Sequence, residues 1–174
     1  MRDPVFTDVH QVAVVVEDLD AALRVYVEEY GIGPWQIFEF GPENGSDLIV
    51  DDEPVEYAMR VAITQLGPVE WELIEPLDDR SDYARFLAEK GSGVHHVAVG
   101  ISSYTDALQT LRDKGRIIRQ GGRNGVVSFA YMSTDDDLGV ITEIVDWPAG
   151  TEHVPVAIYP PGADAPATRT EGPR

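Results

Sequence analysis

Residues 95–108 read HHVAVGISSYTDAL, and they repeat the pattern of residues 10–23, HQVAVVVEDLDAAL. In both stretches a short apolar run typical of a strand passes through a polar turn into apolar residues at helical spacing. Both helix patterns end at a glycine, Gly31 or Gly115, which suits a helix C-cap. An internal repeat of this kind indicates two copies of one structural unit.

Strand-like segments follow both predicted helices. They are residues 35–40, 57–66 and 69–75 in the first half, and 117–120, 127–132 and 140–146 in the second. Each half therefore reads β-α-β-β-β, and residues 81–91 form a short linking helix with Ser81 as its N-cap. We expect one α+β domain over residues 5–148, with module 1 at about 8–77 and module 2 at about 94–148.

The last part of the chain has a different composition. Residues 149–174 are rich in Pro, Ala, Gly and Thr, and they lack the periodic apolar pattern of the preceding segments. We expect a tail outside the core, either loosely ordered or used as an arm on a partner subunit.

Composition and charge narrow the classes of function. The 174 residues include no cysteine, which excludes disulfides, cysteine zinc sites, iron–sulfur clusters and cysteine nucleophiles. Asp and Glu number 31 against 13 Lys and Arg, a formal net charge of −18. A field of that sign repels phosphate backbones and anionic membranes, so we expect neither nucleic acid nor a membrane as a partner. With no long apolar run and no secretory signal pattern, we interpret the protein as cytoplasmic.

Strand alternation selects the first two candidate site residues. Gln11 shares a face with the small or medium residues of its strand, and His96 does the same in the matching strand. The neighbouring histidines, His10 and His95, fall on the bulky apolar face that should lie under a helix. We therefore expect Gln11 and His96 to point into one space, and His10 and His95 to point away from it.

Two acids complete the set. The turn Gly67-Pro68 fixes a hairpin register in which Ile63 faces Glu72. Glu143 lies between apolar residues of the last strand. A single residue of this kind is usually an exposed edge residue or a hydrogen-bonded core residue, but here Gln11 corresponds to His96 by the repeat, and Glu72 corresponds to Glu143. One imidazole, one amide oxygen and two carboxylates suit one divalent metal ion: zinc, nickel, cobalt, manganese or iron.

The chain resembles the vicinal oxygen chelate superfamily over roughly residues 9–147. The likeness is carried by residues 10–23, by YGIGPW at 30–35, by the long stretch 69–99 and by LGVITEIVD at 138–146. The elements ELIEP and HH within 69–99 look most like the glyoxalase I and methylmalonyl-CoA epimerase branch. The resemblance implies a curved mixed sheet of two half-barrel modules around a cavity, the glyoxalase/bleomycin-resistance fold.

The resemblance also implies a site and an activity. The family's metal-ligand positions fall on Gln11, Glu72, His96 and Glu143. Many relatives carry His at the first position, so His10 stays open as an alternative to Gln11. The implied activity is that of a metal-dependent lyase, isomerase or epimerase that stabilises an enolate or enediolate of a small carbonyl or thioester substrate. Glu143 and Glu72 are the implied proton carriers, and Glu143 is preferred.

Two alternative functions stay open. The first is methylmalonyl-CoA epimerase itself, although Ile63 stands where some of these epimerases place a second acid. The second is a non-catalytic protein of the same fold that binds a small molecule such as a drug. Metal content separates the enzyme from the binding protein, because a sequestering cavity has no use for four inward ligands.

Three further residues are candidates for substrate contact. Arg123 lies in the glycine-rich segment GGRNG and could hold an anionic group of the substrate, although an ordinary exposed loop fits equally well. Ile63 and Trp35 could shape a cavity, and core packing is the simpler role for Trp35. We expect a homodimer, and the site lies either within one chain or between two chains.

Overall fold

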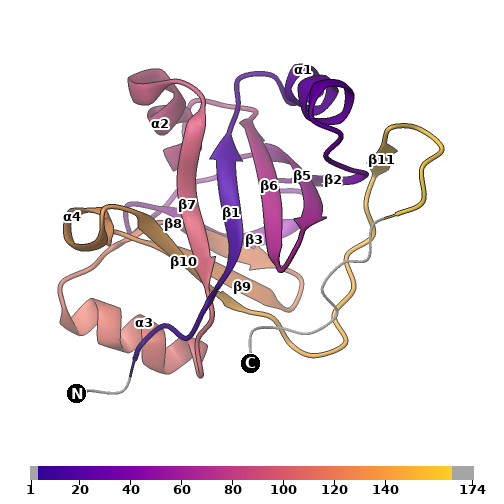
Figure 1. Ribbon diagram of the computed structural model, residues 1–174. Coiled ribbons are helices and arrows are strands. Elements are labelled where there is room, and N and C mark those ends of the chain that lie inside the picture. The colour runs from indigo at the N-terminus through magenta and orange to yellow at the C-terminus, as the bar shows by residue number, and fades with distance from the viewer. Residues whose placement is uncertain (1–3, 166–174) are drawn as a thin grey trace.

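The computed structural model describes residues 4–165 of the chain (Figure 1). The strands are β1 Val9–Val15, β2 Trp35–Phe40, β3 Gly45–Val50, β4 Glu53–Pro54, β5 Met59–Leu66, β6 Val69–Pro76, β7 Gly93–Val99, β8 Ile118–Asn124, β9 Val127–Met132, β10 Ile141–Asp146 and β11 Ala157–Tyr159. The helices are α1 Leu19–Arg24, continued by a π-helical turn at Val25–Glu29, α2 Asp82–Lys90, α3 Tyr104–Asp113 and α4 Asp135–Leu138.

All described strands belong to one mixed, curved sheet. Its order is β11-β2-β5-β6-β1-β7-β10-β9-β8-β3-β4, so the two modules meet at the antiparallel pair β1–β7. Module 1 contributes β2-β5-β6-β1 and α1, and module 2 contributes β7-β10-β9-β8 and α3. The predicted α+β architecture of two β-α-β-β-β units is confirmed.

Three apolar clusters hold the sheet and helices together. On the outer face, Leu19 and Leu23 of α1 pack against module 1, and Ala107 and Leu111 of α3 pack against module 2. The inner face is different, because its cluster combines strands of both modules with Tyr83 and other side chains of the linking helix α2. The two modules therefore share one inner core, on the face where the four predicted metal ligands lie.

The β5–β6 hairpin has the register that its turn predicts. Gly67 has a φ of 63°, a left-handed conformation that glycine adopts without the usual Cβ clash. Ile63 pairs with Glu72, and Gln65 pairs with Glu70. Because alternate residues of β6 face opposite sides, Leu73 joins the α1 cluster while Glu72 and Ile74 face the inner side.

Three strands lie outside the predicted pattern. β3 pairs antiparallel with β8, and β4 extends that edge, so a segment of module 1 joins the far side of module 2. β11 pairs antiparallel with β2, and Tyr159 packs against the α1 cluster. The expectation of a tail outside the core is therefore wrong for Ala157–Tyr159. The end of that predicted tail, residues 166–174, lies outside the described residues.

The helices of residues 4–165 are too short or too polar to cross a membrane.

Candidate active site

The four predicted ligands come from four consecutive strands. Glu72 is on β6, Gln11 on β1, His96 on β7 and Glu143 on β10. Glu72 and His96 both pair with Ala13, while Gln11 and Glu143 both pair with Ala98. The side chains therefore occupy two adjacent rungs of the same inner face, as the repeat predicts.

An imidazole lies against two carboxylates at the centre of this group. His96 Nε2 is 3.4 Å from Glu143 Oε2 and 3.6 Å from Glu72 Oε2. The His96 side chain is fully buried, and those of Glu72 and Glu143 are only 11% and 9% exposed. Glu72 Oε2 and His96 Nε2 are buried without a hydrogen-bond partner. Buried polar atoms without partners are costly, and a cation bound between these two atoms would satisfy both of them.

The three groups also have shifted pKa values. Burial lowers the pKa of His96 to about 3, although the charge of Asp82 opposes the shift. Burial raises the pKa of Glu143 to about 8, although His10 and His95 oppose that shift. Burial, followed by the charges of Glu143 and Glu70, raises the pKa of Glu72 well above its ordinary value. Without a cation, the imidazole is therefore neutral and the carboxyl pair retains protons at neutral pH.

The donor set fits a divalent metal ion in its chemistry, and two of its distances suit a shared ion. Two ligands that each lie about 2.1 Å from a tetrahedral zinc are separated by about 3.4 Å, close to the distances from His96 Nε2 to the two carboxylates. As the side chains stand, no group of three or more His, Asp or Glu in residues 4–165 is arranged to hold a metal. Metal binding would therefore require these side chains to rearrange, with the amide oxygen of Gln11 as the fourth ligand.

The Gln11 amide is oriented by an acid that the sequence analysis did not select. Gln11 Nε2 donates to Glu70 Oε1 over 2.6 Å. A carboxylate only accepts hydrogen bonds, so it takes the NH₂ end of the amide. The carbonyl oxygen of Gln11 is then directed away from Glu70 and can serve as a ligand. The sequence signal for Glu70 is its spacing, since it lies two residues before Glu72 on β6 and therefore shares its face.

Two β-bulges alter the predicted alternation between β1 and β7. Val9 pairs with Val99 but Gln11 pairs with Ala98, so His10 is an extra residue on β1. Val14 pairs with Val94 after Ala13 has paired with His96, so His95 is an extra residue on β7. The bulges occur at equivalent positions of the two modules, and each redirects a side chain.

The predicted orientation of His95 is wrong for this reason. His95 lies on the inner side, with its ring against Tyr83 and Phe86 of α2, and its Nδ1 is 3.1 Å from Nδ1 of His96. His10 is near enough to Glu143 for its charge to lower the Glu143 pKa. Because both histidines are in bulges, strict alternation cannot decide between His10 and Gln11 as the first ligand.

An aromatic wall lies beside the group. Tyr131 stacks on His96 with ring centroids 4.2 Å apart, and its hydroxyl is hydrogen-bonded to that of Tyr83. Tyr131 also pairs with Glu143 across β9 and β10. Burial raises the pKa of Tyr83 and of Tyr131 well above the ordinary value. Both phenols are therefore neutral, and Tyr131 holds the His96 ring in place by stacking while Tyr83 packs against His95.

The predicted substrate contacts are only partly brought together. Ile63 packs against the inner core and pairs with Glu72, so it lies beside the group. Trp35 is fully buried in the α1 cluster on the outer face, so core packing is its role. Arg123 lies on β8, and its side chain is 48% exposed with an ion pair to Asp47 at 3.9 Å. That contact directs Arg123 toward β3 rather than toward the four predicted ligands.

The sequence also matches a known protein family. A profile of the glyoxalase/bleomycin resistance protein/dioxygenase superfamily matches residues 10–131. The chain belongs to this superfamily. Membership confirms the resemblance that the repeat and the segments around Glu72 and His96 indicate.

Two proteins are similar to this chain in sequence. The uncharacterized protein YqjC of Bacillus subtilis is 36% identical over 103 residues, which cover 56% of this chain and 71% of the relative. The mitochondrial methylmalonyl-CoA epimerase of Bos taurus is 29% identical over 142 residues, which cover 78% of this chain and 71% of the epimerase.

Solved structures have the same fold. The hypothetical protein BH1468 from Bacillus halodurans has a TM-score of 0.62 at 21% identity, covering 83% of this chain and 97% of that one, and it shares the fold. A variant of Streptomyces coelicolor methylmalonyl-CoA epimerase in complex with 2-nitronate-propionyl-CoA has a TM-score of 0.56 at 26% identity. That alignment covers 80% of this chain and 94% of the epimerase.

Proposed function

We propose that this protein is a metal-dependent isomerase or epimerase that moves a proton on a carbon next to a carbonyl or thioester group. The observation that carries the proposal is the contact of His96 Nε2 with two buried carboxylates, at 3.4 and 3.6 Å. The similarity to methylmalonyl-CoA epimerases supports the same class of reaction. A lyase of the glyoxalase type belongs to the proposal as well, since it uses the same proton transfer.

Gln11, Glu72, His96 and Glu143 are the residues that would hold the metal. When bound, a divalent cation supplies Lewis-acid stabilisation of the negative charge that forms on a substrate oxygen. His96 is suited to this role because its neutral imidazole keeps a nitrogen directed at the carboxylates. Gln11 contributes an uncharged oxygen, so two carboxylates balance the charge of a divalent ion.

Glu143 and Glu72 are suited to move the proton. They lie on β10 and β6, on either side of the strand pair β1–β7. Glu143 takes the proton from the substrate carbon, the electron pair of the C–H bond passes to the carbonyl group, and an enolate forms. If Glu143 returns a proton to the same face of the enolate, the substrate hydrogen is exchanged with solvent. If Glu72 donates a proton to the opposite face, the configuration of the carbon is inverted. Burial raises the pKa of both carboxyl groups, to about 8 for Glu143, which suits groups that take up and return a proton near neutral pH.

Methylmalonyl-CoA epimerase activity itself is a second candidate, and the epimerases among the relatives favour it. The hydrocarbon side chain of Ile63 faces Glu72 where the resemblance suggests an acid in some of these enzymes. The two candidate functions differ in their substrate and not in their proton carriers, because both use Glu143 and Glu72.

Hydrogen–deuterium exchange tests the proposal. Purified protein, supplied with Zn²⁺, Co²⁺ or Ni²⁺, is incubated in deuterated water with methylmalonyl-CoA, other acyl-CoA thioesters and α-hydroxy ketones. We expect deuterium at the carbon next to the carbonyl of at least one substrate. Exchange and inversion of methylmalonyl-CoA would identify the second candidate, and exchange of another substrate alone would favour the first.

The Glu143→Gln variant assigns the proton carrier. An amide oxygen can still act as a ligand, so we expect this variant to keep part of its metal but to lose exchange by about two orders of magnitude or more. Glu39→Gln changes the same functional group at an exposed position of β2, and we expect wild-type exchange from it. Wild-type exchange by metal-loaded Glu143→Gln would transfer the role to Glu72. Absence of exchange from every substrate, in protein that binds no metal, would favour a small-molecule binding protein.

A further inference from the structure

A chain of buried hydrogen bonds leads away from the candidate site on the far side of His96. His96 Nδ1 is 3.1 Å from His95 Nδ1, and His95 Nε2 is 3.1 Å from Asp82 Oδ2. The side chains of His95 and Asp82 are both completely buried. None of these contacts involves the nitrogen of His96 that faces Glu72 and Glu143.

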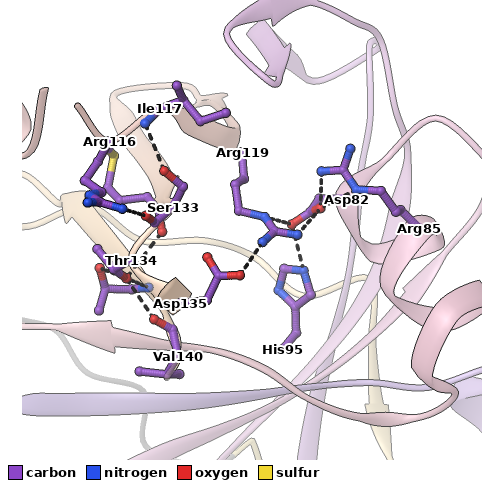
Figure 2. Close-up of polar contacts among 12 residues, drawn as sticks. Asp82, Arg85, His95, Arg116, Ile117, Arg119, Ser133, Thr134, Asp135 and Val140 are labelled. Atoms are coloured by element: carbon purple, nitrogen blue, oxygen red, sulfur yellow. Dashed lines mark hydrogen bonds and ion pairs between the residues drawn. The ribbon is translucent and has the colours of Figure 1, made fainter. Parts of the chain in front are cut away.

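Two arginines hold Asp82 as a carboxylate (Figure 2). Arg119 Nε and Nη2 donate to the two carboxylate oxygens over 3.0 Å each, and Arg85 Nε donates over 3.0 Å. Burial alone raises the pKa of Asp82, but hydrogen bonds and charges from His95 and Arg119 outweigh it and leave the pKa lowered. Asp82 therefore only accepts hydrogen bonds.

The Asp82 carboxylate, at the end of this series of hydrogen bonds, determines the direction of each bond in it. Because Asp82 accepts, His95 Nε2 must donate. His95 is completely buried and the charge of Asp82 is already paired with two arginines, so a second proton on His95 would be a buried charge without a partner; His95 therefore has no proton on Nδ1 and accepts there from His96 Nδ1–H. His96, neutral for the same reason, then has its lone pair on Nε2, the atom that faces the two glutamates.

We propose that Asp82 and His95 are positioning residues that fix the tautomer of His96, so that Nε2 is held unprotonated as a metal ligand. The part of this inference that concerns a metal rests on the proposed function, whereas the tautomer itself does not. Metal-binding histidines commonly donate their second N–H to a neighbouring acceptor, which orients the ring. Here the acceptor is a second histidine, which the bulge on β7 places on the same side as His96.

Long-range ¹H–¹⁵N spectra of the chelator-treated protein test the tautomer directly. In the wild-type protein we expect His96 to carry its proton on Nδ1 and His95 to carry its proton on Nε2. His95→Gln is the conservative variant, because its amide oxygen can accept from His96 and its NH₂ can donate to Asp82. We expect the His96 tautomer to be unchanged in this variant.

Two other variants break the relay, the hydrogen bonds from His96 through His95 to Asp82, in different ways. His95→Phe keeps a ring against Tyr83 and Phe86 but removes the acceptor, so His96 should populate both tautomers. In Asp82→Asn the NH₂ group replaces Oδ2 opposite His95, which reverses both hydrogen bonds and moves the His96 proton to Nε2. Asp135→Asn removes another ion pair of Arg119 without touching the relay, so it is the control and should leave the tautomer unchanged.

Metal affinity, measured by competition for Zn²⁺ with a chromophoric chelator, gives the second readout. We expect losses of about 10–100-fold for His95→Phe and Asp82→Asn, and affinity near that of the wild type for His95→Gln and Asp135→Asn. If the wild-type tautomer is as expected but the protein binds no metal, the relay stands and the proposed function fails. A His96 protonated on Nε2 in the wild type, or folded His95→Phe and Asp82→Asn variants with unchanged tautomer, would overturn the inference.

Discussion

His10 and His95 precede the candidate ligands of the two modules, and the structure makes each of them the extra residue of a β-bulge. Alternation along the strands correctly predicts that Gln11, Glu72, His96 and Glu143 share the inner face. It cannot predict the bulges, because a bulge depends on the pairing of two strands and not on the pattern of either one. For the same reason the His95–Asp82 contact has no signal in the sequence pattern.

The choice of first ligand can be tested at the residue scale. Glu70 holds the NH₂ end of Gln11, which leaves the amide oxygen for a metal. We expect Gln11→Ala to weaken Zn²⁺ binding by at least tenfold, and His10→Ala to leave it near that of the wild type. Isothermal titration of both variants measures the two affinities. The reverse ranking would assign the first ligand position to His10.

The raised pKa of Glu143 predicts a pH dependence of stability in the metal-free protein. Folded Glu143 retains its proton up to about pH 8, whereas the unfolded chain releases it near 4.5. The folded state thus binds more protons in this window, and the free energy of unfolding falls as pH rises through it. His95, His96 and His153 have lowered pKa values and act in the opposite sense, until the unfolded histidines have lost their protons at about pH 7.5.

Urea unfolding between pH 7.5 and 8.5 isolates the carboxyl contribution, because the unfolded histidines are then neutral. For the metal-free wild type we expect a loss of up to about 1.4 kcal/mol per pH unit for each proton released. Glu143→Gln should show a smaller slope because it cannot release that proton, and Glu39→Gln should match the wild type. A free energy of unfolding that is constant or rises over this range would contradict the buried, proton-retaining state of Glu143.

At the scale of elements, local patterns account for the hairpin and helices but not for the sheet edges. The turn Gly67-Pro68 and the N-cap Ser81 are short-range signals, and both predict the observed structure. β3 and β11 are stabilised by pairing with β8 and β2, strands that are distant in sequence. The segment of β11 follows a proline-rich stretch without strand periodicity, so nothing local distinguishes it from a loop.

Removal of β11 tests its contribution. A chain that ends at Gly150 loses the pairing with β2 and the packing of Tyr159 against the α1 cluster. We expect a fall in stability of about 1–3 kcal/mol, measured by urea unfolding. Zn²⁺ affinity should not change, because β11 is separated from β7 by β2, β5, β6 and β1. An unchanged stability would show that the pairing is marginal, and a lost metal would place the tail in the site.

At the scale of the whole molecule, the junction of the two modules creates the candidate site. β1 and β7 are the first strands of the two repeats, and their antiparallel pairing brings β6 and β10 to either side. The four predicted ligands therefore lie within one chain. The repeat in residues 10–23 and 95–108 contains enough information to predict this symmetry, but not the side-chain contacts. A homodimer and a cytoplasmic location stay predictions.

Metal content tests the central claim most directly. Protein purified without chelator, dialysed and analysed by plasma mass spectrometry should contain about one divalent metal ion per chain. His96→Ala should contain almost none while remaining folded by circular dichroism, because it removes the nitrogen that faces Glu72 and Glu143. Metal-free wild-type protein that also binds none of Zn²⁺, Co²⁺, Ni²⁺, Mn²⁺ and Fe²⁺ on titration, or His96→Ala protein with a full complement of metal, would contradict the account.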